Sequence, residues 1–200
     1  MYVSCTANPS HCGGRGGCTG GTQDLLFEYA MAHGFYLEES VPYISGNGTE
    51  PACPRLDGGA GPLGAIKGYV DVAANDAEAH MIALQAQPLA ISLDASEFHA
   101  YHSGVMEFDD CGAELNHAVV LVGYGTDEET GQDFWIVRNS WGESWGEGGY
   151  IRLQRSDRCA LDTKPQDGVG CDGENTPVVV CGTCGMLTYT SYPVGAFIYN

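Results

Sequence analysis

Two stretches decide the fold of this chain: residues 115–125, which read LNHAVVLVGYG, and residues 134–150, which read FWIVRNSWGESWGEGGY. Each contains a continuous apolar run that is typical of a buried strand. His117 stands at the start of the first run, and Asn139 stands at the end of the second. A histidine on a rigid strand end can hold a proton for a nucleophile, and an asparagine oxygen on a neighbouring strand can fix its tautomer.

Trp141 follows the asparagine by two residues and is placed to cover a hydrogen bond between the two side chains. Excluding water in this way strengthens such a bond. Taken singly, His117 is more often a structural histidine and Asn139 a turn residue. Together, the two motifs favour a catalytic pair.

Composition limits the function classes that fit. The chain has 200 residues, 44% of them hydrophobic, which predicts a folded chain with a sizeable core. Its 29 glycines favour a structure rich in turns and strands. Lys and Arg number 8 against 26 Asp and Glu, a formal charge of −18. We therefore expect neither nucleic acid nor a membrane as a partner, because both carry negative charge.

Cysteine usage indicates an oxidising compartment. Nine cysteines predict disulfides, and the sequon Asn47-Gly48-Thr49 agrees with secretion. The residues after Met1 form no apolar signal segment, and no run approaches membrane-spanning length. Secretory chemistry without a secretory signal predicts that a segment N-terminal to this sequence is absent from it.

Two helices are predicted. The first is capped by Thr22, runs to about residue 33 and stops at Gly34. The second begins at a capping box of Asn75 and Glu78 and runs through about residue 85. Both lie between segments that read as irregular or extended.

Strands dominate the rest of the chain, with turns between them. A change in composition near Pro62 predicts a boundary between residues 1–62 and residues 63–200, with about the last 15 residues returning towards the first part. The predicted strands are 66–72, 89–93, 118–123, 134–138, 149–153 and a run within 185–200. Residues 156–184 form a cysteine-bearing excursion.

The two stretches resemble the histidine and asparagine segments of the papain family of cysteine peptidases, nearest to cathepsin L-like enzymes. The segments GGCTGG (16–21), EESVPY (38–43), PLAISLDAS (88–96) and CGMLTYTSYP (184–193) match the same family in its order. The resemblance implies an α+β fold of two lobes, a partial helical lobe and an antiparallel β-barrel lobe. It implies a cysteine-type endopeptidase with its active site in the cleft between the lobes.

The resemblance also implies roles for individual residues. His117 is the proton donor and acceptor, and Asn139 orients it. Gly20 and Gly21 form the wall where a substrate backbone pairs like an added strand, which needs side chains to be absent. The backbone carbonyl of Asn116 accepts the substrate amide, and Trp141 shields the pair. The specificity pocket is lined near Thr22, Gln23, Ser92, Leu115, Ala118 and Tyr189, several of which are more polar or bulkier than is typical of cathepsin L.

The catalytic cysteine of the family lies roughly 130–150 residues before the histidine and asparagine. That distance places it upstream of Met1, together with the glutamine of the oxyanion hole. Cys18 precedes a helix, but its setting matches a structural disulfide cysteine of the family. Cys5 lacks the tryptophan and apolar helix expected after the nucleophile. We therefore expect a fragment without its nucleophile, which alone is unstable and inactive.

For the remaining cysteines, the resemblance implies the disulfides Cys5–Cys53 and Cys111–Cys184. Cys12, Cys159, Cys171 and Cys181 stay unassigned. A zinc site built from the cysteines at 159, 171, 181 and 184 is an alternative interpretation, although no histidine supports it. We otherwise expect neither a metal nor a cofactor.

Three functional readings remain. The first is the endopeptidase, which acts on protein or peptide substrates. The resemblance implies a monomer, since the family is usually monomeric. The second is a non-catalytic homologue, a peptide-binding or regulatory module that kept the cleft and lost the thiol. The third, a disulfide-stapled extracellular protein, explains the cysteines but not the paired motifs. The family and the cysteine content predict a lysosomal, vacuolar or secreted location.

Overall fold

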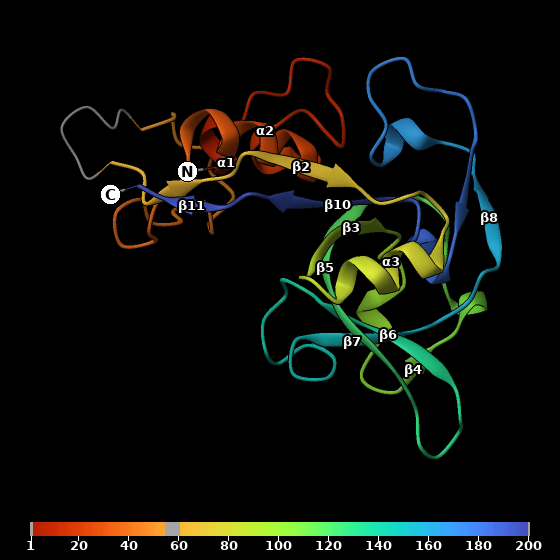
Figure 1. The fold of residues 1–200 in the computed structure, drawn as a ribbon. Coiled ribbons are helices and arrows are strands. Elements are labelled where there is room, and N and C mark those ends of the chain that lie inside the picture. The colour runs from red at the N-terminus through yellow and green to blue at the C-terminus, as the bar shows by residue number, and fades with distance from the viewer. Residues whose placement is uncertain (1, 55–60, 200) are drawn as a thin grey trace.

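The computed structural model describes residues 2–54 and 61–199, which form a small helical part beside a large sheet (Figure 1). The α-helices are α1 (Tyr2–Cys5), α2 (Gln23–His33) and α3 (Ala77–Leu84). Short 3-10 helices are η1 (Gly17–Thr19), η2 (Phe98–Ala100), η3 (Phe108–Asp110), η4 (Pro165–Asp167) and η5 (Thr183–Gly185).

The strands are β1 (Gly64–Ala65), β2 (Gly68–Asp71), β3 (Leu89–Leu93), β4 (Val105–Met106), β5 (His117–Thr126), β6 (Asp133–Arg138), β7 (Tyr150–Gln154), β8 (Cys159–Asp162), β9 (Val178–Cys181), β10 (Tyr189–Val194) and β11 (Phe197–Ile198). Seven of them form one sheet in the order β2-β10-β3-β5-β6-β7-β4. All neighbours in it are antiparallel except β4 and β7. The predicted α+β class is confirmed.

The large sheet is open, so the expected closed barrel is not present. Its edge strands are β2 and β4, and within residues 2–54 and 61–199 each pairs with a single neighbour. Closing a barrel needs strands long enough to pair at both edges. β4 has two residues, which leaves too short an edge for a second ladder.

The core lies on one face of the sheet, where alternate strand residues point inward. Trp135 of β6, Leu121 of β5 and Ile91 of β3 are fully buried there. Phe98 joins them from η2. Each such side chain stabilises the fold by about 1.5–3 kcal/mol. This packing fixes the ends of β5 and β6, where the two motif residues lie.

Helix α2 has the bounds that the sequence predicts. Thr22 precedes it with extended backbone, and Gly34 ends it with a φ of 76° while its amide donates to the carbonyl of Ala30. A Cβ on Gly34 would lie 2.6 Å from the carbonyl oxygen of Gly64, so the stop requires glycine on two counts. Only Gln23 and Ala30 of this helix are buried.

Helix α3 is present, but its predicted cap is wrong. The cap is Asp76, whose side chain accepts a hydrogen bond from the amide of Ala79 at 2.9 Å. Asn75 instead has a φ of 62° and ties the helix to the excursion, because its Oδ1 accepts from the amide of Cys181 at 3.0 Å. A side chain that bonds to a distant strand cannot also cap its own helix.

The excursion at 156–184 contains the two-stranded sheet of β8 and β9. At the other end of the molecule, β11 pairs with β1, close to the helical part (Figure 1). The expected return of the last 15 or so residues towards residues 1–62 stays a prediction. The division of the chain at residues 62 and 63 stays a prediction.

Four disulfides are present. Cys5–Cys53 and Cys111–Cys184 are the pairs that the resemblance implies. The unassigned cysteines form Cys12–Cys171 and Cys159–Cys181. The zinc interpretation is therefore wrong, since every sulfur it needs is engaged in a disulfide. Cys18 is free and exposed.

Candidate active site

The sheet brings His117 and Asn139 together. His117 opens β5, and Asn139 follows β6 directly. Because β5 and β6 are antiparallel with Val120 opposite Arg138, both residues emerge at the same edge of the sheet. The Nε2 atom of His117 lies 2.9 Å from Oδ1 of Asn139. The two sequence motifs are thus joined by one hydrogen bond between His117 and Asn139.

Asn139 is held in this orientation from several sides. Its backbone amide donates to the carbonyl of Gly149 at 2.9 Å. Its side-chain Oδ1 also accepts from the backbone amide of Ser140 at 2.8 Å. The residue is only 8% exposed. An oxygen that accepts from the imidazole fixes the proton on Nε2 and leaves Nδ1 as the ring nitrogen available to a nucleophile.

An aromatic cluster covers the pair. The ring of Trp141 lies 5.3 Å from that of His117, and Trp145 packs edge-on against Trp141 at 5.3 Å. His99 stacks on Trp141 with ring centroids 4.8 Å apart and planes 14° from parallel. The sequence analysis did not find His99, because no motif or spacing links the loop after β3 to the tryptophan.

Beside His117 lies a cavity of about 220 Å³. Six of the predicted substrate-binding residues line it: Gly20, Gly21, Ser92, Leu115, Asn116 and Ala118. The side chain of Asn116 is engaged within the fold, since its Oδ1 accepts a hydrogen bond from the backbone amide of Ala95 at 3.0 Å. That the backbone carbonyl of Asn116 accepts the substrate amide stays a prediction.

Thr22, Gln23 and Tyr189 are not part of this lining. Gln23 accepts from Ser92 at 3.2 Å and donates to the carbonyl of Tyr189 at 3.2 Å. The hydroxyl of Tyr189 donates to Asp24 at 2.9 Å, and burial together with that carboxylate raises the pKa of Tyr189. The polar groups of the predicted specificity pocket therefore satisfy one another.

The cavity has two walls that the sequence analysis missed. Gly13 and Gly14 contribute to one side, and residues 166–169 contribute to the other. Both belong to loops rich in Gly and Cys, and no periodicity in the sequence places either loop in space. The disulfide between Cys12 and Cys171 would have shown that the two loops lie together, but the spacing of cysteines in a sequence does not reveal how they pair.

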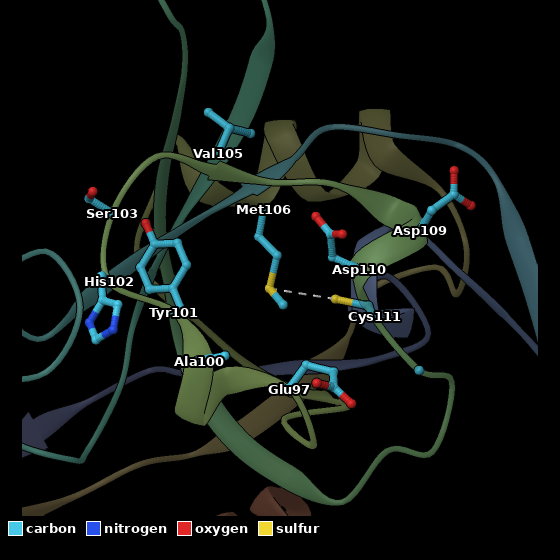
Figure 2. Close-up of a pocket in the computed structure, with 11 residues that line it drawn as sticks. Glu97, Ala100, Tyr101, His102, Ser103, Val105, Met106, Asp109, Asp110 and Cys111 are labelled. Carbon is cyan, nitrogen blue, oxygen red and sulfur yellow. Dashed lines mark hydrogen bonds between the residues drawn. The ribbon is translucent and has the colours of Figure 1, made fainter.

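A larger cavity, about 840 Å³, is a separate feature lined by the loop between β3 and β5 (Figure 2). Met106 extends into it, with its Sδ 3.9 Å from the sulfur of Cys111 (Figure 2). His117, Asn139 and Trp141 are not among its lining residues. Size therefore does not identify the site in this molecule.

A family model described as papain family cysteine protease matches residues 1–169. The chain belongs to the papain family. A papain-family relative, cysteine endopeptidase Rep1 of Oryza sativa subsp. japonica, is 39% identical over 181 residues, which cover 89% of this chain and 42% of the relative. A cathepsin L-like protein of Caenorhabditis elegans is 44% identical over 158 residues, 76% of this chain and 45% of the relative.

Solved papain-family structures share the fold. The Amb a 11 cysteine protease, a ragweed pollen allergen in its proform, has a TM-score of 0.72 and 33% identity, over 97% of this chain and 50% of that chain. Bromelain of Ananas comosus, in complex with the E64 inhibitor, has a TM-score of 0.70 and 28% identity, over 97% and 86%. The chain spans less than half the length of the curated relatives named above.

Neither a metal centre nor a membrane span marks this papain-family chain in the part that the structure describes. No group of three or more His, Cys, Asp and Glu side chains there could hold a metal ion. No helix there is long and apolar enough to cross a bilayer.

Proposed function

We propose that this chain supplies the histidine and asparagine of a cysteine peptidase that hydrolyses peptide bonds in protein and peptide substrates. The observation that carries the proposal is the 2.9 Å contact between His117 and Asn139 under Trp141, at the edge of a cavity. Family membership supports it. Several relatives are named endopeptidases, and that mode of cleavage is the sequence-based expectation for this chain.

The proposed nucleophile is a cysteine outside the 200 residues. Eight of the nine cysteines form disulfides, and the ninth, Cys18, lies 3.7 Å from the carbonyl of Thr49 in the helical part. Among the described residues, none that lines the cavity beside His117 is a cysteine. In the proposed enzyme, a thiolate paired with the protonated ring of His117 would occupy that position. Such pairing lowers a cysteine pKa to roughly 3–4, so the thiolate persists in acid.

The proposed reaction has two steps. The thiolate attacks the carbonyl carbon of the scissile bond, the C–N bond breaks, and the His117 imidazolium gives its proton to the departing amine. Water then attacks the acyl-enzyme while His117 takes a proton from it, and the acid product leaves with the thiolate restored. Asn139 keeps the ring in the orientation that both transfers need.

The second candidate is a non-catalytic homologue that binds peptides. It is favoured by the lack of a cysteine in the described lining of the cavity and by the polar residues near the predicted specificity pocket. In that case His117 and Asn139 would be retained for their place in the fold. The two candidates differ in one atom, the sulfur beside His117.

Two experiments separate the candidates. The coding DNA upstream of Met1 should read a Gln followed about six residues later by Cys-x-x-Cys-Trp for a peptidase; Ser or Gly at the second Cys position indicates a binding module. The full-length protein should then be labelled by a thiol-directed peptidyl electrophile, and the His117→Ala variant should label far more slowly. Failure of the intact full-length protein to label would contradict the peptidase.

We also propose a lysosomal, vacuolar or secreted location and a monomeric state. The four disulfides and the exposed sequon at Asn47 support an oxidising route. One relative in Arabidopsis thaliana is named a KDEL-tailed cysteine endopeptidase, and such a tail is a retention signal in the secretory route. Fractionation of cells that express the full-length protein tests the location directly.

A further inference from the structure

Two loops far apart in the sequence both line the cavity beside His117 and are joined to each other. The disulfide between Cys12 and Cys171 links positions separated by 159 residues. Two backbone hydrogen bonds, of 2.9 and 3.2 Å, join the same segments, residues 10–13 and residues 170–172. We call these two segments and their disulfide the crossbridge. In Figure 1 the loop that contains residues 10–13 (red) and the loop that contains residues 170–172 (blue) lie side by side at the top of the view.

The crossbridge is also tied by charge and by close packing. Nδ1 of His11 lies 2.8 Å from Oδ2 of Asp172. A Cβ on Gly168 would lie 2.6 Å from the carbonyl oxygen of Leu115, so the loop that leads into the crossbridge packs directly on the wall of the cavity. Since Gly168 is buried, the loop is held against that wall rather than extended into solvent.

The cavity ends where the crossbridge begins. Gly13 and Gly14 line it from one side, and residues 166–169 line it from the other. A Cβ on Gly20 would lie 2.4 Å from the carbonyl oxygen of Gly13, so the loop of the crossbridge abuts the Gly20–Gly21 wall itself. The cavity has a volume of about 220 Å³, so only a short stretch of peptide fits in it between His117 and the crossbridge.

In the proposed function, the substrate half that occupies this side is the acyl half, which precedes the scissile bond. It pairs with Gly20 and Gly21 and fills the pocket that Ser92, Leu115 and Ala118 line. A chain that continues beyond this half towards its own N-terminus meets the crossbridge. A chain that ends there does not.

We propose that the crossbridge closes the acyl end of the groove, so that the protein releases short peptides from free N-termini rather than cutting within long chains. This inference rests on the proposed function and replaces its endopeptidase expectation. The substrate class is a peptide or protein with an accessible α-amino group.

Asp167 gives the closed end a charge that suits such a substrate. It is the acidic side chain among the described residues that line the cavity, and its side chain is 61% exposed. Lys164 stands 3.9 Å away in a loose, exposed pair that leaves the carboxylate accessible. Burial, followed by the charges of Asp167, Asp94 and Asp162, raises the pKa of Glu114 nearby. The accessible carboxylate of Asp167 at the cavity wall therefore suits an α-ammonium group.

The test uses the full-length protein and peptides of one sequence with either a free or an acetylated N-terminus, with products read by mass spectrometry. Release of short N-terminal fragments, at least tenfold faster from the free peptide, is expected. The Cys12→Ser/Cys171→Ser double variant should cut the acetylated peptide and internal bonds. The Cys159→Ser/Cys181→Ser variant removes a disulfide outside the crossbridge and should keep the original products. Equal cleavage of both peptides by the intact protein would overturn the proposal, as would an unchanged product pattern in the double variant.

A second variant covers the case in which the double variant fails to fold. Asp167→Asn should reduce the preference for the free N-terminus by about 2–5-fold, the range of an exposed ion pair; no change would overturn the assignment of Asp167. A protein that neither cleaves nor labels contradicts the proposed function instead. The proposal that the crossbridge closes the acyl end is then tested by calorimetric measurement of the binding of the free and the acetylated peptide. Equal affinity for both peptides would overturn this proposal.

Discussion

Asn139 acts on His117 through one oxygen, and that oxygen also accepts from the amide of Ser140. Such a bifurcated acceptor stays in place when the imidazole gains or loses its proton. The aromatic ring of Trp141 limits access of water to the same contact. In the proposed enzyme, these two contacts would orient the imidazole of His117 and shield its proton from water.

Replacement of Asn139 by alanine should lower kcat/KM of the full-length protein by about 10–100-fold, because a hydrogen bond to a charged partner is worth about 1.5–3 kcal/mol. We expect most of the loss in kcat, together with a shift in the pH profile, since KM depends on the cleft. The matched control is Asn175→Ala, an exposed asparagine in the excursion. Equal kinetics for Asn139→Ala and the control would contradict an orienting role.

How far the site could be foreseen depends on the kind of residue. His117 and Asn139 stand in motifs whose strand ends the apolar pattern predicts, so sequence alone places them together. His99 stands in a loop, and stacks on Trp141 only because η2 packs on the core through Phe98. Contacts made by tertiary packing of loops leave no periodic trace in a sequence.

At the scale of elements, the strands show the same limit. β3 has the bounds that its sequence predicts, whereas β5 extends to Thr126, beyond the predicted end at residue 123. The added residues pair with β6 after an irregular register step near Gly123. Glycines at 123 and 125 argue for a turn on propensity, and pairing with a neighbouring strand overrides that preference.

The cap of α3 provides a test at this scale. Asp76→Ala should lower the free energy of unfolding by about 1 kcal/mol, since it leaves the amide of Ala79 without its partner. The sequence-based capping box assigned the reciprocal role to Glu78, so Glu78→Ala serves as the comparison and should change stability by less than about 0.5 kcal/mol. Urea unfolding of the full-length protein measures both. A larger loss of stability for Glu78→Ala than for Asp76→Ala would contradict the Asp76 cap and favour the predicted capping box.

At the scale of the whole molecule, charge pairs link separate turns. Arg152 of β7 donates to Glu147 at 2.8 and 2.9 Å and to Asp127 at 2.9 Å. Glu147 belongs to the turn that follows Trp141 and Trp145. The hydrogen bond from Arg152 holds the pKa of Glu147 below its usual range. Hydrogen bonds from Thr130, and then from Arg152, do the same for the pKa of Asp127.

These depressed pKa values predict how stability depends on pH. A carboxyl whose pKa is lower in the folded state contributes stability above its unfolded pKa, about 4, and loses it as the pH falls further. The melting temperature should therefore fall between about pH 5 and pH 3, and Arg152→Met should flatten this fall. Arg158→Met removes a more exposed pair with Asp109 and should alter the pH dependence less. Parallel curves for wild type and Arg152→Met would contradict the linkage.

The helical part predicts the behaviour of residues 1–200 expressed alone. Leu25, Leu26 and Phe27 of α2 are only half-buried, and Met31 and Leu37 are 43% and 45% exposed. Apolar surface of this kind favours association, and folded domains have only about 5–15 kcal/mol of stability to spare. We expect aggregation, or melting without a cooperative transition, and no peptidase activity. A soluble monomer with one sharp calorimetric transition would contradict this expectation.

The pairing of Cys12 with Cys171 has a consequence for ancestry. Loss of either cysteine leaves its partner as an unpaired thiol, and a shortened loop on one side cannot reach the other. Selection therefore acts on the two loops as one heritable trait, although 159 residues separate the two cysteines. Among descendants of a common ancestor, both cysteines should appear or vanish together.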